Sequence, residues 1–425
     1  MDNRAGRLAC LAAVVSFAGC SIAELRREIF DHIEPPAELT GAVTGPEETN
    51  RVVVVLVQQH ASGRGDVYRC AVLPHPGPFS FLVRSGTYRL FAFADRNGSA
   101  TLDRDEPAAW HGSLAGVRAY PGAQLDGLDI TLQGNRAKRD KSLDAYESVP
   151  DELRRCVGRE HAGDVAGIRN ERFSAATGKR GLWDPVGFEA DFGTGVWMLQ
   201  PYHPDRIPVV FVHGAAGCPQ EWSTIVSSLD AARFQPWVFQ YASGARLDSV
   251  GDRLADAIAE LRRRYGFSKL FVVAHSMGGL VSRAALPRID ARCGAHVVRL
   301  FVTISTPWLG HDAAQLGVRH SPFVIPSWKD MSPGSAFLRA VRAKQLSPDV
   351  TYYLFFGYRG GETLLMHENS DESVTLQSVL DPTAQDEAAR IRGFFEDHES
   401  ILRSKDVIYE LNRVMTEAAA DRVAW

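Results

Sequence analysis

From about residue 185 onward, short apolar runs alternate with segments whose apolar residues recur every three or four positions. The apolar runs predict strands at 207–212, 235–241, 269–274, 296–304, 350–357 and 388–395. Helical spacing is clearest between the second and third of these strands, at Val250, Leu254, Ile258, Leu261 and Tyr265. This spacing predicts an amphipathic helix. Strands that alternate with helices form a mostly parallel, doubly wound sheet, so the fold class predicted for residues 185–425 is α/β.

The N-terminal half has a different pattern, with no long helical period. Strand-like runs between Gly, Pro, Asp and Asn turns lie at Val52–Val57, Phe79–Val83, Tyr88–Phe93 and Leu128–Leu132. They predict a small β-sandwich over residues 41–133, a size that folds alone. The segment Ser85-Gly-Thr-Tyr-Arg-Leu90 resembles transthyretin-like and carboxypeptidase-regulatory-like modules. Polar, Arg-rich residues 134–184 are predicted to connect the two domains, and a length of 425 residues suits two domains.

The first 19 residues have the pattern of a secretion signal. Arg4 and Arg7 precede the apolar run Leu8–Ala18, and Phe17-Ala-Gly-Cys20 resembles the lipobox of bacterial lipoproteins. That resemblance implies a lipid on Cys20, a tether over residues 20–40 and, with Ser21 next, sorting to the outer membrane. The alternative is a secreted or periplasmic protein in which Cys20 has no such role.

Composition narrows the possible functions. Apolar residues make up 45% of the chain and charged residues 23%, which is typical of a globular protein. The net charge of −4 argues against a nucleic-acid partner, because such proteins carry a basic surface. No apolar run reaches 18 residues, so the sequence predicts no membrane-spanning helix in the mature chain.

The candidate nucleophile lies in the segment Phe271-Val-Val-Ala-His-Ser276-Met-Gly-Gly279. A short apolar run precedes Ser276, and helical spacing follows the two glycines. A serine at the apex of a strand-to-helix turn exposes its hydroxyl beside a helix N-terminus, which suits a nucleophile. Ala274 stands where the usual pattern has Gly, and it keeps that position small.

Two motifs resemble those of α/β-hydrolase lipases and esterases, including bacterial lipases and lipid deacylases. Pro208-Val-Val-Phe-Val-His-Gly-Ala-Ala-Gly217 resembles their His-Gly oxyanion loop, and Ala274–Gly279 resembles their nucleophile elbow about 60 residues later. The resemblance covers residues 185–425. It implies backbone N–H groups of Ala215 and Met277 as the oxyanion hole, and no metal or organic cofactor.

A serine nucleophile needs a base, and the base needs a carboxylate. In this fold the order is Ser, Asp or Glu, then His, on loops at the carboxyl ends of strands. Asp371 follows the predicted strand 350–357 and His398 follows the last one, so we expect Asp371 as the orienting acid and His398 as the base. Glu372 and Asp381 stay open as alternative acids. Of the other histidines, His367 belongs to the same loop as Asp371, and His213 and His275 flank the motifs as structural residues.

Two further segments each have two interpretations. Residues 308–349 fall where this fold places a cap, and their apolar side chains either cover an acyl-chain substrate or pack on a small core of their own. The loop Asp95–Glu106 has oxygen-bearing side chains at EF-hand positions 1, 3, 5, 9 and 12, which indicates Ca²⁺. However, Ala100 replaces the usual Gly at position 6 and strands flank the loop, so a polar hairpin turn is the favoured interpretation and Ca²⁺ is the alternative.

The favoured hypothesis is therefore a serine hydrolase that cleaves carboxylic esters, with lipid acyl esters or small esters as substrates. An acyltransferase or phospholipid deacylase with the same acyl-enzyme is the alternative among enzymes. A non-catalytic envelope scaffold is the alternative of another class.

Overall fold

The computed structural model describes residues 34–420, apart from gaps at 46–50, 61–64, 74, 113–115, 133–140, 148–150, 154–160, 322–323 and 360–368. The described chain forms two compact units, 34–160 and 161–420. The predicted signal, Cys20 and most of the predicted tether lie outside the described residues. The division between the units falls at 160/161, whereas the sequence pattern had placed it after residue 184.

The first unit is a β-sandwich, as predicted. One sheet has β1 (Ala37–Thr44) between β4 (Pro78–Val83) and β8 (Gln124–Leu125), with β9 (Ile130–Thr131) also paired to β1. The other sheet has the order β3 (Gly65–Leu73), β2 (Val52–Gln59), β5 (Gly86–Ala94), β6 (Ala108–Trp110), with β7 (Val117–Ala119) paired to β5. Apolar side chains of both sheets share one core.

Two of the predicted boundaries of this unit are wrong. β1 begins inside the segment expected to be a tether, because the side chains of Ala37 and Leu39 are fully buried in the sandwich core. Part of the expected connector also belongs here. The turn η2 (Lys141–Leu143) and helix α3 (Asp144–Glu147) pack on the outer face of a sheet, where Leu143 is fully buried.

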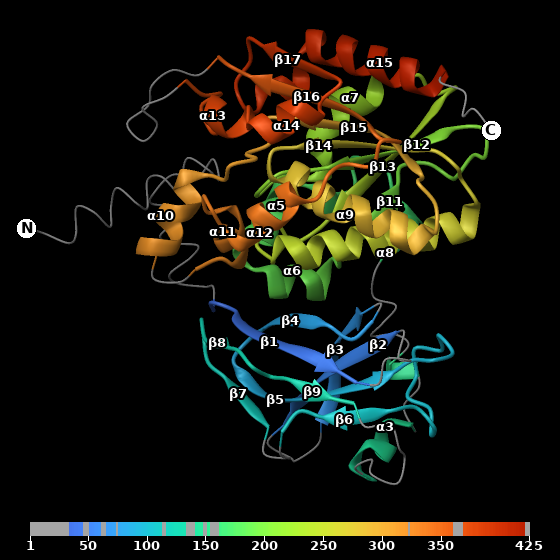
Figure 1. The fold of residues 1–425 in the computed structure, drawn as a ribbon, viewed down its shortest axis with the longest axis vertical. Helices are drawn as coiled ribbons and strands as arrows, with labels where there is room; N and C mark the ends of the chain where they lie inside the picture. The colour runs from blue at the N-terminus through green and yellow to red at the C-terminus, as the bar shows by residue number, and fades with distance from the viewer. Residues whose placement is uncertain are drawn as a thin grey trace, which may run out of the picture. The chain divides into compact units, whose positions relative to one another are not determined.

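The second unit is built on an eight-stranded sheet (Figure 1). Its strands, in spatial order, are β10 (His161–Val165), β11 (Gly195–Met198), β13 (Phe234–Gln240), β12 (Ile207–Val212), β14 (Leu270–His275), β15 (Val298–Ile304), β16 (Thr351–Gly357) and β17 (Arg390–Phe394). The six strands from β13 to β17 are parallel and correspond to the six predicted strands. β10 and β11 add an antiparallel edge that the apolar pattern had not indicated.

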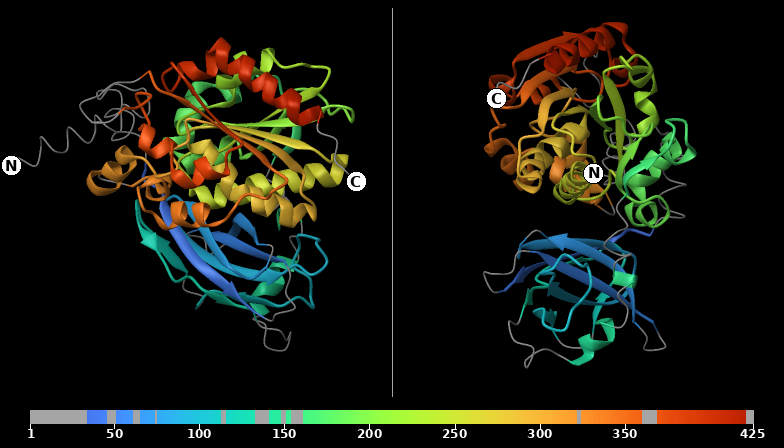
Figure 2. Two further views of the ribbon diagram at one scale, coloured as in Figure 1. Left: turned by 45° about the horizontal axis from the view of Figure 1, so that its top comes forward. Right: turned by 90° about the vertical axis from the view of Figure 1, so that its right-hand side faces the viewer.

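Helices cover both faces of this sheet (Figure 2). On one face lie α5 (Ala175–Trp183), α8 (Leu247–Tyr265) and α9 (Met277–Cys293), whose apolar side chains join the larger core. On the other face lie α7 (Ser223–Ser227) and α15 (Lys405–Ala420). The predicted amphipathic helix is α8, and its residues Val250, Leu254, Ile258 and Leu261 are buried. This doubly covered, mostly parallel sheet is the predicted α/β fold.

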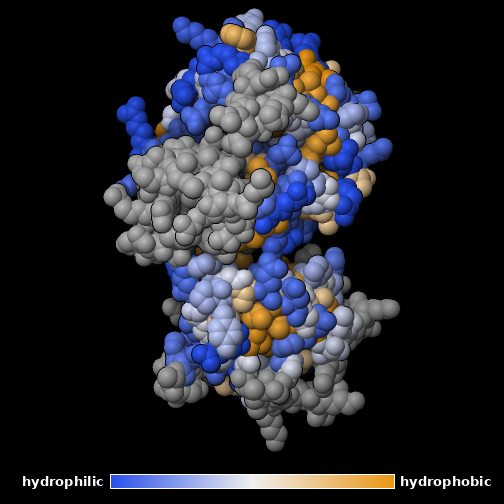
Figure 3. All heavy atoms as spheres, turned by 90° about the vertical axis from the view of Figure 1, so that its left-hand side faces the viewer, coloured by the Kyte–Doolittle hydropathy of each residue, from blue (hydrophilic) through white to orange (hydrophobic). Residues whose placement is uncertain are grey.

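The segment expected to be a cap contains α10 (Asp312–His320), α11 (Pro326–Met331) and α12 (Ala336–Ala343). No helix in the part of the chain that the structure describes is long and apolar enough to cross a membrane. On the face drawn in Figure 3, apolar side chains reach the surface in small groups among polar ones.

Candidate functional site

Ser276 stands at the sharp turn between β14 and α9. Its backbone has φ 53° and ψ −130°, and its side chain is nearly buried. A non-Gly residue in such a conformation costs on the order of 1–3 kcal/mol and is held only where its surroundings demand it. Here the N–H of Ser276 donates to the carbonyl of Ile304 at 2.8 Å, and its own carbonyl accepts from Gly279 N and Thr306 Oγ1. The turn therefore fixes the serine at the carboxyl edge of the sheet.

The glycines around Ser276 are required for close packing. A Cβ on Gly278 would lie 2.5 Å from the carbonyl oxygens of both Val212 and His213. A Cβ on Gly214 would lie 2.9 Å from Cβ of Ser276. The loop after β12 is thus pressed directly against the nucleophile turn, and the two motifs seen in the sequence form one site.

Contacts with Tyr241, Ser243 and helix α5 hold the loop of His213 to Gly217 in place. The His213 ring stacks on Tyr241 at 4.3 Å between centroids, and the Tyr241 hydroxyl donates to the His213 carbonyl. Ala216 has φ 53°, and its N–H donates to Ser243 Oγ. A Cβ on Gly178 of α5 would lie 2.4 Å from the carbonyl oxygen of Gly217, so α5 packs tightly on this loop. Helix α5 falls in the segment 134–184 that was predicted to be a connector, and no pattern in the sequence indicated that it packs on this loop.

His398 and Asp371 form a hydrogen-bonded pair. Nδ1 of His398 lies 2.8 Å from Oδ2 of Asp371, and the N–H of His398 donates to the Asp371 carbonyl. Asp371 is fully buried, and its Oδ1 accepts the N–H groups of Ser373 and Val374. Burial alone would raise the pKa of Asp371, but the charge of His398 and these hydrogen bonds hold it below its usual value. The carboxylate is therefore ionised and fixes the proton of the imidazole on Nδ1.

His398 lies in the turn between β17 and η5 (Ser400–Arg403). Asp397 Oδ1 accepts the N–H groups of Glu399 and Ser400, and η5 follows. Burial lowers the pKa of His398, but the Asp371 charge and hydrogen bond outweigh it and leave that pKa raised.

The alternative acids have other surroundings. Asp381 caps α14 (Pro382–Glu387) and pairs with Arg342 at 2.7 Å. Glu372 has φ 76° and an exposed side chain. Asp371 is thus the carboxylate that the structure places against His398. The remaining rival base, His367, lies outside the described residues.

His275 links the turn of Ser276 to the loop of His398. Its Nε2 lies 2.9 Å from the carbonyl oxygen of His398, and the two rings are 4.6 Å apart between centroids. Burial, together with the charge of His398, lowers the pKa of His275 to about 3, so the ring is neutral and Nε2–H is the donor. Ser276 follows directly in the chain. His275 therefore brings the Ser276 turn and the His398 loop to the same edge of the sheet.

One titratable residue near the site was missed in the sequence. Glu221 lies in η4 (Pro219–Trp222), and its Oε2 is 2.9 Å from where a Cβ on Gly217 would stand. Burial raises the pKa of Glu221 to about 7, and His398 is among the charges that act on it. It is the one ionisable side chain in the Pro-Gln-Glu-Trp turn close to the His-Gly motif, which was the signal available in the sequence.

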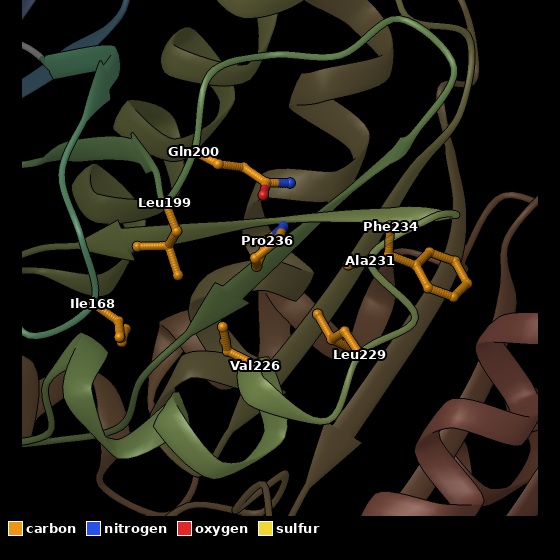
Figure 4. A pocket seen from close by; sticks show the side chains of 8 residues that line it. All are labelled: Ile168, Leu199, Gln200, Val226, Leu229, Ala231, Phe234 and Pro236. Atoms are coloured by element: carbon orange, nitrogen blue, oxygen red, sulfur yellow. The ribbon is translucent and has the colours of Figure 1, made fainter.

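A pocket of about 230 Å³ lies elsewhere, where β13 begins (Figure 4). Its walls are the side chains of Ile168, Leu199, Gln200, Val226, Leu229, Ala231, Phe234 and Pro236. Since Ser276 stands at the carboxyl end of a parallel strand and Phe234 at the amino end, the pocket is at the opposite edge of the sheet. It does not belong to the site of Ser276.

The apolar side chains of the cap segment are mostly buried. Trp308, Ile325, Trp328, Met331, Phe337 and Leu338 are each less than 10% exposed and belong to the larger core. These side chains pack on the larger core of the domain and not on a separate small core of their own.

No group of three or more His, Cys, Asp or Glu side chains that could hold a metal ion occurs among the described residues. Lipases and esterases of the α/β-hydrolase fold generally need no cofactor. The groups that the structure shows at this site are the side chains of Ser276, Asp371 and His398.

Comparison with known proteins agrees with this geometry. Residues 204–339, which include β12, the Ser276 turn and most of the cap, match a family model described as "Putative serine esterase (DUF676)". No curated protein sequence matches the chain. The match extends from the oxyanion loop through the nucleophile and ends before Asp371.

Solved structures of esterases and lipases resemble about half of the chain. The mature lipase BlEst2 of Bacillus licheniformis is 19% identical, covers 52% of this chain and 97% of its own, and has a TM-score of 0.41. A carboxylesterase structure from Nitrososphaera gargenis is 10% identical, covers 53% and 94%, and has a TM-score of 0.36. A putative aryl esterase of Burkholderia cenocepacia is 14% identical, covers 53% and 95%, and has a TM-score of 0.34.

Proposed function

We propose that the protein is a serine hydrolase that cleaves carboxylic esters through an acyl-enzyme on Ser276. The observation that carries this proposal is the hydrogen-bonded pair of His398 and Asp371, which His275 links to the turn where Ser276 is held at φ 53°. The esterase family match over residues 204–339 supports the same reaction class. A serine in a strained conformation and a buried carboxylate at the same edge of a sheet are typical of a catalytic site. Neither feature is required in a scaffold protein.

In the proposed acylation step, Oγ of Ser276 attacks the ester carbonyl carbon and Nε2 of His398 takes the hydroxyl proton. His398 can do so because Asp371 holds the other ring proton on Nδ1. When the tetrahedral intermediate collapses, the carbon–oxygen bond to the alcohol breaks and His398 returns the proton to the leaving alcohol. Water then attacks the acyl-enzyme by the same route and releases the carboxylic acid.

Main-chain donors are proposed to stabilise the oxyanion. Met277 begins α9, so its N–H is one of the first amides of a helix and has no carbonyl one turn earlier to bind. Ala215 follows Gly214, and the backbone at Gly214 is so close to Ser276 that an added Cβ would lie 2.9 Å from the Ser276 Cβ. Each such donor is worth about 10²- to 10³-fold in rate.

We propose esters of either small or lipid acyl chains as the substrate class. The buried cap side chains do not by themselves supply a surface for a long acyl chain. Hydrolysis of short p-nitrophenyl esters in parallel with emulsified long-chain lipids distinguishes the two. A preference for emulsified substrate above its solubility limit would identify a lipase.

Labelling with a fluorophosphonate probe tests the reaction class. The full chain should be modified at Ser276, Ser276→Ala should not react, and Ser227→Ala, which changes an exposed serine of α7, should react like the wild type. Absence of labelling in folded protein would overturn the enzyme proposal and leave the scaffold alternative.

Anchoring to the bacterial envelope through a lipid on Cys20 is a separate proposal, supported by the lipobox-like segment alone. Incorporation of labelled palmitate in cells should be lost in Cys20→Ala. Unchanged incorporation would contradict it and favour secretion.

A further inference from the structure

Ser305 follows the last residue of β15 and has an unusual backbone. It is fully buried and has φ 51°, in the left-handed region where glycine is the usual residue because it has no Cβ. Such conformations persist only where the surroundings hold them, and they cluster at functional sites. Ala216 and Ser276 of the site described above share this feature, each with φ 53°. The hydroxyl of Ser305 is what a glycine at this position would lack.

The hydroxyl of Ser305 takes the place of a main-chain carbonyl at the end of the sheet. The pairing of β15 with β16 ends at Ile304 and Phe355, and the N–H of Ser305 donates to the carbonyl of Phe355. In a regular parallel ladder the carbonyl of Ser305 would accept the N–H of Gly357. Instead, that N–H donates to Oγ of Ser305 at 3.2 Å. The side chain therefore closes the ladder, and this bond holds it in one position.

That position is next to Asp371. Gly357 packs against the acid so closely that an added Cβ would lie 3.2 Å from Cβ of Asp371. Oγ of Ser305 accepts from Gly357, and the hydroxyl donates in turn to the Asp371 carboxylate. Burial raises the pKa of Asp371, whereas the charge and hydrogen bond of His398 lower it. The hydrogen bonds from Val374 N–H and the Ser305 hydroxyl lower that pKa further, so the hydroxyl stabilises the ionised acid.

The residues on either side of Ser305 hold Ser276. The carbonyl of Ile304 accepts the N–H of Ser276 at 2.8 Å, and Oγ1 of Thr306 donates to the carbonyl of Ser276 at 3.0 Å. In the sheet, β15 lies between β14, which leads to Ser276, and β16, which precedes the loop of Asp371. Three consecutive residues at the end of β15 therefore contact Ser276 on one side and Asp371 on the other.

We propose that Ser305 is a positioning residue that orients the carboxylate of Asp371 toward His398. This role rests on the proposed serine hydrolase function. The N–H groups of Ser373 and Val374 hold Oδ1 of Asp371 from within its own loop, and the Ser305 hydroxyl donates from the end of β15. Donors on two separate elements thus fix the rotation of the carboxylate. The hydroxyl acts through Asp371 and not on the reacting atoms.

Ser305→Ala and Ser305→Gly both remove the hydroxyl and differ in how well they suit φ 51°. Each should lower kcat on a short ester by about 10- to 10²-fold, the worth of a hydrogen bond to a charged group, and change KM by less than about twofold. The thermal midpoint of Ser305→Gly should exceed that of Ser305→Ala by about 2–4 °C, because glycine suits the backbone. Ser327→Ala is the matched control and should keep wild-type kcat, since Ser327 is fully buried and its Oγ has no hydrogen-bond partner in the described chain.

A double mutant separates positioning from packing. Asp371→Asn already leaves the imidazole in the wrong tautomer, so adding Ser305→Ala should lower kcat by no more than about twofold further. Losses that multiply in the double mutant would overturn the proposal, because the hydroxyl would then act by another route. Wild-type kcat in Ser305→Gly, which suits φ 51° even if Ser305→Ala does not fold, would overturn it as well. A folded wild type that neither hydrolyses esters nor labels with fluorophosphonate would overturn the proposed function too, whereas an active wild type with unaffected Ser305 variants overturns this role alone.

Discussion

His275 Nε2 donates a hydrogen bond to the main-chain carbonyl of His398 at 2.9 Å. The residue before Ser276 therefore holds the loop that carries His398. Since β14 and β17 are separated by two strands in the sheet, the loop after β17 needs such a contact to reach Ser276. His275 is neutral because burial lowers its pKa, so this hydrogen bond persists throughout the range in which the enzyme would act.

His275→Ala should lower kcat by about fivefold, because one net hydrogen bond is worth about 1 kcal/mol and the His398 loop loses its hydrogen bond to the residue before Ser276. His275→Gln keeps an N–H donor and should recover part of that loss. Steady-state kinetics on a short ester measures both. Equal kcat in the Ala and Gln variants, with equal loss of thermal stability, would indicate that the ring contributes packing alone.

Asp371→Asn should lower kcat by up to about 10⁴-fold with little change in KM, because the amide leaves the imidazole in the wrong tautomer. Oδ1 can still accept from Ser373 and Val374, so the fold should be retained. Kinetics together with circular dichroism measures this.

Asp381→Asn is the matched control. It weakens the pair with Arg342 and the cap of α14, so it should cost about 1–3 kcal/mol of stability and leave kcat nearly unchanged. A loss of kcat in Asp381→Asn as large as in Asp371→Asn would contradict the assignment of the acid.

Much of the catalytic unit could be predicted from the sequence because its strands are continuous apolar runs. Parallel strands buried on both faces have that pattern, and their carboxyl ends define one edge. The resemblance to α/β-hydrolases then pointed to Asp371 and His398 on loops at that edge. In the structure their side chains are hydrogen-bonded to each other.

The sequence could not predict features that arise only from tertiary packing. β10 has the sequence His-Ala-Gly-Asp-Val, which has no apolar alternation, and it pairs because β11 offers an open edge. Gly178 is one small residue in a polar segment, yet it contacts the oxyanion loop. The contact between His275 and His398 joins residues 123 positions apart and has no local signal.

Glu221→Gln should shift the acid limb of the kcat/KM profile to lower pH. His398 must be neutral to accept the Ser276 proton, and Glu221 is one of the charges that raise the pKa of His398. Burial places the pKa of Glu221 at about 7, so above that pH its charge stabilises the imidazolium. The neutral amide removes this stabilisation, so the pKa of His398 falls and more of the base is neutral at pH values near and above 7, where Glu221 is ionised in the wild type.

The pH profile of a soluble ester assay measures the shift. Glu260→Gln, on the solvent side of α8 and paired with Arg263, should leave the acid limb in place. A limb that stays at its wild-type pH in Glu221→Gln would mean that the carboxylate does not act on His398.

Gly178→Ala should lower kcat by about 10²-fold, the loss expected for one oxyanion donor. The added Cβ would stand 2.4 Å from the carbonyl oxygen of Gly217 and 2.8 Å from that of Ala216, and a backbone carbonyl cannot move aside without moving the loop. Because Ala216 is already held at φ 53°, the displacement should pass to Ala215 and its N–H. Gly167→Ala, where a Cβ meets nothing within 4 Å, is the control and should keep wild-type kcat. If Gly178→Ala lowered the thermal midpoint while kcat stayed unchanged, α5 would support the fold without positioning the oxyanion loop.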